Sequence, residues 1–305
     1  MRVMVTGGAG FIGSHLVDRL VKDGYDVIIL DDLSSGSKMN IKKHLESKKV
    51  KFVIGDVRDS KLLLKYLRGV EVVFHNAAIV SVSQSFKSPT KVNDVNVNGT
   101  LALLQACIAN KVRRFIYSSS AAVYGNIPPP LREDSPTNPI SPYGVTKLAA
   151  ERYIQLYHES YGLETISLRY FNVYGPRQRV GHYSGVIMRF IQRLKDNKRP
   201  IIYGDGEQTR DFIYIDDVID ANMIALNTKA VGHVFNIATG IPTSINELAK
   251  QIGEILGKSD IKPMYFKPKV GDIKHSYGDV SKAQHILNFQ AKIKLSQGLR
   301  KMLDR

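Results

Sequence analysis

Short apolar runs and amphipathic segments alternate along the first half of the chain. Residues 2–6 and 26–30 are apolar runs typical of buried parallel strands, and residues 13–22 between them have a helical apolar period that ends before Gly24. These segments form one β-α-β unit. The same alternation predicts further strands and helices, at residues 51–54, 60–68, 70–75, 99–110 and 114–118.

This order of elements predicts an α/β fold with a doubly wound parallel-sheet Rossmann domain. Residues 127–142 hold six of the twelve prolines and are therefore expected to form a loop before a helix that begins near Pro142. After Asn172 the pattern is less regular, with helices predicted at residues 186–195, 216–226 and 245–256. We therefore expect the Rossmann domain to span 1–172. A smaller mixed α/β substrate domain would occupy 173–305, with some of its elements returning to the Rossmann sheet.

Composition narrows the class of protein. A chain of 305 residues exceeds what one core usually supports, and 43% hydrophobic with 23% charged residues is ordinary for a folded protein. No apolar run is long enough to span a bilayer, and the N-terminus lacks a signal-peptide core, so we expect a cytoplasmic protein without a membrane partner. A single cysteine, Cys107, excludes an internal disulfide; we expect it to be a packing residue, and we expect no metal centre.

The net charge of +15 raises the alternative of nucleic-acid binding. However, the basic residues are scattered, with only short clusters such as Lys48-Lys49-Val50-Lys51, and no nucleic-acid motif accompanies them. We therefore expect solvated surface lysines and no nucleic-acid partner. A rival RNA-binding hypothesis would require affinity for RNA that falls steeply with salt.

A glycine-rich loop follows the first predicted strand. Gly7-Gly8-Ala9-Gly10-Phe11-Ile12-Gly13 opens a helix, where glycines allow a pyrophosphate to approach the free N–H groups of the first helical turn. Asp31 ends the second strand, where a carboxylate can bind both ribose hydroxyls and repel a 2′-phosphate. The sequence therefore predicts NAD as cofactor, bound by Gly7, Gly10, Phe11, Ile12, Gly13 and Asp31.

A second group of residues has the spacing of an acid/base site. Tyr143 and Lys147 lie four apart at a predicted helix start, so the ammonium can lower the pKa of the phenol. Ser118-Ser119-Ser120 ends a predicted parallel strand, where hydroxyls face the ligand crevice. In isolation these serines would only cap a strand; together with the glycine loop they indicate a catalytic site.

The chain resembles the extended short-chain dehydrogenase/reductases, and within them the UDP-glucose 4-epimerase group. The resemblance spans nearly the whole chain and rests on the glycine loop and on four further motifs: Asn96-Val97-Asn98-Gly99-Thr100, Ser118-Ser119-Ser120-Ala121-Ala122-Val123-Tyr124-Gly125, Ser141-Pro142-Tyr143-Gly144-Val145-Thr146-Lys147 and Arg169-Tyr170-Phe171-Asn172-Val173-Tyr174-Gly175-Pro176-Arg177.

The resemblance implies that Tyr143 is the acid/base, that Lys147 holds the nicotinamide ribose and that Ser120 orients the sugar 4-hydroxyl. It also implies further cofactor contacts from Asp56, Val57, Asn96, Ser118 and Tyr170. Contacts to a UDP-sugar substrate would come from Asn172, Val186, Tyr203, Arg210, Lys269 and Asp272. Lys269 stands where the family usually has Arg. The lysine keeps the positive charge but cannot bind a phosphate bidentately, as a guanidinium does.

Two positions distinguish among relatives. Ala121-Ala122 stands where the related dehydratases carry an Asp-Glu pair. The absence of these two carboxylates favours simple epimerisation. Ser276 stands where epimerases of plain sugars carry Tyr, which predicts that N-acetylated sugars fit. Another nucleotide-sugar oxidoreductase or dehydratase, or a non-catalytic NAD-binding regulator, remains an alternative. The resemblance also implies a homodimer through the helices near Thr100 and Tyr143.

Overall fold

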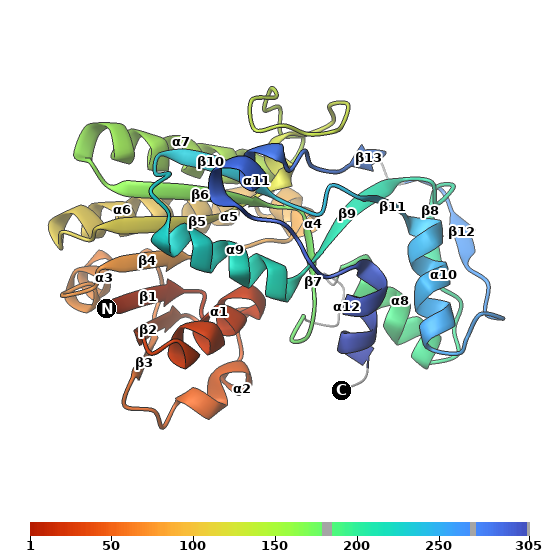
Figure 1. The fold of residues 1–305 in the computed structure, drawn as a ribbon, viewed down its shortest axis with the longest axis horizontal. Helices are drawn as coiled ribbons and strands as arrows, with labels where there is room; N and C mark the ends of the chain where they lie inside the picture. The colour runs from red at the N-terminus through yellow and green to blue at the C-terminus, as the bar shows by residue number, and fades with distance from the viewer. Residues whose placement is uncertain (179–184, 269–272, 304–305) are drawn as a thin grey trace. The chain divides into compact units, whose positions relative to one another are not determined.

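The fold is α/β, as the alternation of segments predicted. A computed structural model describes residues 1–178, 185–268 and 273–303, which divide into two compact units (Figure 1). Unit 1 contains Met1–Gly125, Pro139–Arg169 and Ile219–Phe235, and unit 2 contains Asn126–Asn138, Tyr170–Val218 and Asn236–Arg305. Neither unit is one continuous segment. Within the described ranges, no helix is both long and apolar enough to cross a bilayer.

A seven-stranded sheet forms the centre of unit 1. Its strand order is β10-β6-β5-β4-β1-β2-β3, and the pairs from β3 to β5 are parallel. The strands are β1 (Arg2–Thr6), β2 (Asp26–Asp31), β3 (Val50–Ile54), β4 (Val72–His75), β5 (Arg114–Ser120), β6 (Glu164–Tyr170) and β10 (His233–Ile237). The order reverses between β1 and β4, which is where Rossmann folds bind their ligands.

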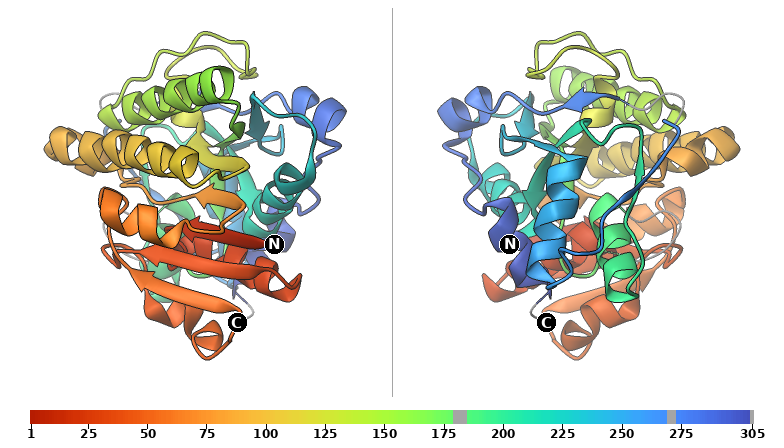
Figure 2. Two further views of the ribbon diagram at one scale, coloured as in Figure 1. Left: turned by 90° about the vertical axis from the view of Figure 1, so that its left-hand side faces the viewer. Right: turned by 90° about the vertical axis from the view of Figure 1, so that its right-hand side faces the viewer.

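Helices cover both faces of this sheet (Figure 2). On one face, apolar side chains of α3, α6 and α7 pack into a continuous core with β1 to β5. The other face is covered by α1 and by α9 from Ile219 onward. The helical segments of unit 1 are α1 (Phe11–Lys22), α2 (Lys38–Ile41), η1 (Lys42–His44), α3 (Ser60–Tyr66), α4 (Val82–Lys87), α5 (Pro89–Asn93), the π-helical η2 (Asp94–Asn98), α6 (Gly99–Ala109), η3 (Ala121–Val123), α7 (Pro142–Tyr161) and most of α9 (Ile215–Asn227).

Unit 2 is built on two small sheets. In the larger one β9 (Thr209–Tyr214) pairs with β7 (Asn172–Tyr174), β11 (Pro242–Ser244) and β13 (His275–Ser276). The smaller one joins β8 (Ile201–Tyr203) to β12 (Met264–Phe266). The helices are α8 (Val186–Lys195), α10 (Ile245–Ile255), which packs against α8, α11 (Ser281–Leu287) and α12 (Leu295–Leu303).

The predicted boundaries differ from the observed ones by a few residues. Helix α1 begins at Phe11, two residues earlier than predicted, because Gly10 has an extended backbone and serves as its N-cap. Strand β5 continues to Ser120 rather than ending at Ser118, so all three serines of that motif are in the strand. The predicted proline-rich loop is confirmed between η3 and α7.

Candidate active site

The glycine loop lies at the point where the strand order reverses. It follows β1 and touches the segment after β4, since a Cβ added to Gly7 (φ +66°) would lie 2.8 Å from the Ala77 backbone nitrogen. A Cβ added to Gly13 would lie 2.2 Å from the Gly7 carbonyl oxygen. Side chains at these two positions would therefore separate the loop from its neighbours.

The first turn of α1 has the donor set that a diphosphate requires. No side chain caps this helix, and the backbone N–H groups of Phe11, Ile12 and Gly13 have no acceptor within the described part of the chain. Such N–H groups, with the positive end of the helix dipole, attract phosphate oxygens. The residues present thus fit a dinucleotide.

Asp31 is held in place at the carboxyl end of β2. Only 6% of it is exposed, and its carboxylate accepts hydrogen bonds from the backbone nitrogens of Ala9 (2.9 Å) and Leu33 (2.8 Å). Burial raises its pKa. A carboxylate accepts about four hydrogen bonds, so it can take further donors such as ribose hydroxyls.

Asp56 and Val57, two of the predicted cofactor contacts, have protein partners of their own. The Asp56 carboxylate accepts a forked pair of hydrogen bonds from Arg58, at 2.9 and 2.6 Å, which lowers the pKa of Asp56. Val57 is part of the apolar core. This segment nevertheless lies beside Asp31, the residue predicted to bind the ribose, because the Gly55 nitrogen donates to the Asp31 carbonyl (3.1 Å).

Asn96 connects two parts of the site. Its side-chain amide donates to the Ile79 carbonyl and to the Thr146 hydroxyl, both at 3.0 Å, and its amide oxygen accepts from the Ile79 nitrogen at 2.8 Å. These bonds join the segment after β4 to the first turns of α7. A substitution of Asn96 would therefore disturb the segment after β4 in addition to any direct contact of Asn96 with the cofactor.

The structure brings Ser120, Tyr143 and Lys147 together. Ser120 ends β5, while Ser141 caps α7 by accepting from the Gly144 nitrogen (3.1 Å) and so fixes the turn that carries Tyr143. The Ser120 hydroxyl lies close enough to the Tyr143 phenol to lower its pKa. The Lys147 ammonium donates to the Ser118 carbonyl (2.7 Å) and lies 6.0 Å from the centre of the Tyr143 ring.

Burial decides the charge of both residues. It raises the pKa of Tyr143 to about 12, against a smaller lowering by the Ser120 hydrogen bond, and it lowers the pKa of Lys147 to about 7. The expectation that Lys147 lowers the pKa of this phenol is therefore wrong for the chain itself. The Lys147 ammonium donates to the Ser118 carbonyl, and desolvation of the phenolate dominates the pKa of Tyr143.

Sequence reasoning missed a buried ion pair behind these residues. Arg169 and Glu151, which are 4% and 5% exposed, pair at 2.8 Å between the end of β6 and α7. The same carboxylate accepts from the Ser119 hydroxyl and raises the pKa of Lys147, one helical turn away. Its only signal in the sequence is a charged residue within a buried strand.

Asn76 is a second residue that sequence reasoning missed. Its amide oxygen accepts from the Ser118 hydroxyl (2.6 Å), while its buried amide nitrogen has no hydrogen-bond partner among the residues that the structure describes. A buried donor without a partner is unfavourable. Its position directly after β4, at the reversal of strand order, could have identified it as a ligand contact.

Unit 2 gathers several of the predicted substrate residues on β9 and its neighbours. Ser276, on β13, pairs in register with Arg210 on β9, and Asn172 on β7 pairs with the residue two further along β9. Tyr203 ends β8, Val186 begins α8 and the buried Tyr170 ends β6. The predicted contacts Lys269 and Asp272 lie outside the described residues.

Asp211 stabilises this arrangement and was also missed. It is fully buried, and its carboxylate accepts from the backbone nitrogens of Thr239 (2.9 Å), Gly240 (2.9 Å) and Gly278 (3.3 Å). These bonds fix the loop after β10 and the chain after Ser276 against β9. Asp211 thereby positions the strand that carries Arg210.

Comparison with known proteins gives the family. The model for the NAD dependent epimerase/dehydratase family matches residues 3–238. The chain belongs to this family. Membership confirms the predicted resemblance and the predicted cofactor, and it agrees with the fit of the glycine loop and Asp31 to a dinucleotide.

Relatives that match this family member over its full length include proteins named as epimerases and others named as dehydratases or a decarboxylase. It is 43% identical to the "Putative UDP-glucose 4-epimerase" of Methanocaldococcus jannaschii, with 99% of this chain and 97% of the relative covered. It also matches the structure of UDP-glucose 4-epimerase from Thermotoga maritima with UDP-glucose (TM-score 0.95, 39% identity, 100% and 98% covered). A UDP-N-acetylglucosamine 4-epimerase from Methanobrevibacter ruminantium M1 in complex with UDP-N-acetylmuramic acid is equally similar (TM-score 0.95, 40% identity, 99% and 97% covered).

The remaining predictions concern metals and the cysteine. Among the described residues no group of three or more His, Cys, Asp or Glu side chains could hold a metal ion. Cys107 is free and buried in the unit 1 core, where burial raises the pKa of its thiol. A thiol in this state is a weak nucleophile.

Proposed function

We propose that this epimerase-family protein interconverts UDP-hexoses that differ at C4, through a transient 4-keto sugar. The observation that carries the proposal is that Ser120, Tyr143 and the buried Lys147 meet at the carboxyl end of β5, in the same sheet as β1 with its glycine loop. A phenol in contact with a hydroxyl at a parallel strand's carboxyl end is placed for proton transfer at a bound alcohol.

In this mechanism the phenolate form of Tyr143 would take the proton of the sugar 4-hydroxyl, while Ser120 would donate a hydrogen bond to the reacting oxygen. Because burial raises the pKa of Tyr143 to about 12, the phenolate is the minor form in the unliganded chain. The α1 turn, Asp31 and Lys147 would hold NAD, which would supply a reversible acceptor for the C4 hydride. Ala9 and Leu33 fix the Asp31 carboxylate for its ribose contact. Lys147, which donates to the Ser118 carbonyl, would hold the nicotinamide ribose.

Dehydratase chemistry is the main alternative, because the family includes both activities. Loss of water requires a further acid or base near the sugar. The residues directly after Ser120 are Ala121 and Ala122, which supply none. Epimerisation needs no group beyond Ser120, Tyr143 and Lys147, and is therefore the preferred activity. A keto-reductase, or a non-catalytic regulator, would share the fold without turning over UDP-hexose.

To test the proposal, the purified protein is incubated with UDP-galactose and with UDP-glucose, with and without added NAD, and products are separated by anion exchange. Tyr143→Phe should lower turnover by at least roughly a hundredfold while NAD stays bound, because the lost phenol is the acid/base. Near-normal turnover in this variant, or formation of a dehydrated product by the wild type, would contradict the assignment.

We further propose that N-acetylated UDP-sugars are substrates. Ser276 is a small, buried residue next to Arg210 in the unit 2 sheet. A Tyr at this position would fill space that an acetamide needs. Ser276→Tyr should abolish activity on UDP-GlcNAc and UDP-GalNAc and retain it on UDP-galactose. A wild type that is active on the plain sugars and inactive on the acetylated ones would exclude this specificity.

We also propose a homodimer through α6 and α7. Val145 (50% exposed), Tyr153 and Leu156 (52% exposed) lie on one face of α7, and Phe86 is exposed on the neighbouring α4. Such an apolar helical face is typical of a protein interface. Leu156→Arg should yield a monomer by light scattering, whereas Ile286→Arg, at a position in unit 2 that is 45% exposed, should remain dimeric. A monomeric wild type would refute the proposal.

A further inference from the structure

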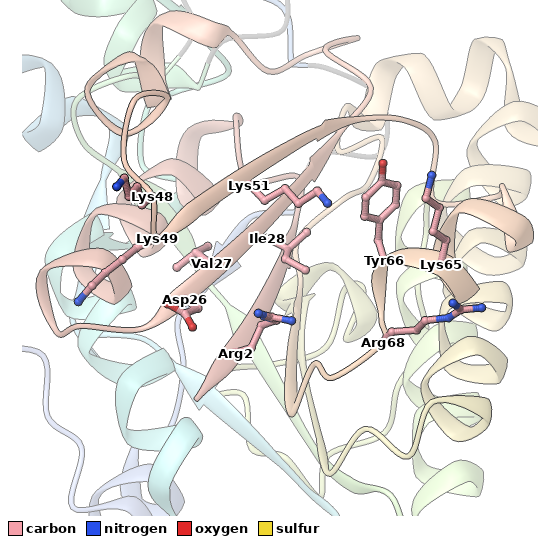
Figure 3. Close-up of a pocket in the computed structure, with 10 residues that line it drawn as sticks. All are labelled: Arg2, Asp26, Val27, Ile28, Lys48, Lys49, Lys51, Lys65, Tyr66 and Arg68. Carbon is pink, nitrogen blue, oxygen red and sulfur yellow. The ribbon is translucent and has the colours of Figure 1, made fainter.

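A basic groove lies at the amino end of the unit 1 strands. It has a volume of 310 Å³ and is formed by the starts of β1 and β2, by β3 and by the end of α3 (Figure 3). Asp26 is the one carboxylate among the residues that line it, against six cationic side chains: Arg2, Lys48, Lys49, Lys51, Lys65 and Arg68. The sequence showed only a short lysine cluster, because the other cations join it through the fold.

These cations differ from other basic residues of unit 1. Arg19, Arg58 and Arg114 are each paired with a carboxylate at 2.8 Å or less. Within the described part of the chain, none of the six groove cations is paired in this way. The groove therefore gathers positive charge that the protein does not neutralise, and an anion would remove the mutual repulsion.

Two of the ammonium groups are held by one aromatic ring. Lys51 lies 4.9 Å and Lys65 5.2 Å from the centre of the Tyr66 ring, and Figure 3 shows the ring between them. Cation–π contacts of this kind restrict long lysine side chains. The site is thus partly organised before any ligand arrives, and the ring faces are taken by cations rather than open to stack a base.

The groove is separate from the dinucleotide loop. In a parallel sheet all amino ends meet at one edge, and Asp31 lies five residues beyond Asp26 along β2, about 17 Å away. A ligand in the groove therefore does not compete for the Gly7 to Gly13 loop. The groove is a recess of 310 Å³, which suits a compact ligand better than a nucleic-acid strand.

We propose that this groove binds a compact anion with several phosphate groups, such as a short chain of condensed phosphates. Six cations around one recess match several phosphate charges at once, and a lone orthophosphate would engage only part of the set. The site is independent of the proposed epimerase activity. Its ligand would bind the folded protein alone and would raise the stability of that state.

The test measures tripolyphosphate binding by calorimetry, with saturating NAD and UDP present to block the other phosphate sites. The wild type should bind, with affinity that falls as salt rises, and it should bind orthophosphate far more weakly. The triple variant Lys51→Gln/Lys65→Gln/Arg68→Gln should bind at least about tenfold more weakly. These three side chains are exposed, and thermal melting checks that the variant is folded.

The matched control is Lys91→Gln/Lys195→Gln/Lys250→Gln, which removes the same charge from exposed positions away from the groove and should retain wild-type affinity. Equal losses in both triple variants would reduce the effect to net charge and overturn the proposal. Displacement of tripolyphosphate by NAD and UDP would assign it to the active site. Preferential binding of a single-stranded RNA, with affinity that grows with its length, would assign the surface to nucleic acid.

Discussion

At the scale of single residues, surroundings decide what a glycine does. Gly7 and Gly162 both have left-handed backbones, with φ of +66° and +69°, which cost other residues about 1–2 kcal/mol. Around Gly162 nothing lies within 4 Å of an added Cβ, whereas Gly7 would meet the Ala77 backbone at 2.8 Å. Alanine at Gly162 therefore adds backbone strain alone, whereas alanine at Gly7 adds the same strain and also displaces the glycine loop.

We expect Gly7→Ala and Gly162→Ala to lose similar stability from strain, about 1–2 kcal/mol in urea unfolding. Only Gly7→Ala should also lose NAD affinity, by more than about tenfold, because the backbone it would touch cannot move like a side chain. NAD titration of both variants makes the comparison. Equal NAD affinity in the two proteins would show that the loop tolerates the shift.

At the scale of elements, the Glu151–Arg169 pair joins α7 to β6 behind the proposed catalytic residues. Glu151→Gln leaves the buried Arg169 guanidinium without a counter-charge, which should cost roughly 3–5 kcal/mol of unfolding free energy. Glu159→Gln, on the exposed side of the same helix, should cost little. Urea unfolding of the two variants tests this difference.

The same variant should change the pH dependence of activity. Glu151 raises the pKa of Lys147, which burial holds at about 7. Without that carboxylate the ammonium is lost at lower pH, so the alkaline limb of turnover should move to lower pH. A purely structural role would reduce stability and leave the limb unchanged, and Glu151→Asp should partly restore both.

Local patterns predicted most of these elements. Apolar runs identified β1, β2 and β5, and the glycine loop and the Tyr143–Lys147 spacing identified the two halves of the site. Short helices such as α2 and α4 escaped, because four to six residues carry too little periodicity. The ion pair escaped because 18 residues and a change of element separate its members. The predicted direction of the Tyr143 pKa shift was wrong, because the spacing of Tyr143 and Lys147 does not show that the phenol is buried.

At the scale of the whole molecule, buried bases make stability depend on pH. Burial lowers the pKa of His75 from 6.5 to about 3 and that of Lys147 from 10.5 to about 7. Between about pH 3 and 6.5 for His75, and between about pH 7 and 10.5 for Lys147, the unfolded chain binds a proton that the folded protein does not. The free energy of unfolding therefore rises with pH in both intervals. Tyr143, whose pKa is raised from 10.0 to about 12, acts in the opposite direction above pH 10.

His75 governs the acid side. Its ring hydrogen-bonds the hydroxyls of Thr6 (2.7 Å) and Thr100 (2.9 Å) and so links β1 to α6 in its neutral form. Between pH 7.5 and 5 the unfolded histidine gains a proton, and the folded one does not. This difference should remove about 2 kcal/mol of unfolding free energy from the wild type over that interval.

His75→Gln has an amide that can reach both hydroxyls without titrating. We expect its free energy of unfolding to fall by about 2 kcal/mol less than the wild type between pH 7.5 and 5, whatever its absolute stability. His285→Gln, at an exposed position, should keep the wild-type dependence. Urea unfolding at the two pH values decides the matter, since parallel losses in wild type and His75→Gln would mean that acid acts on the molecule through other groups.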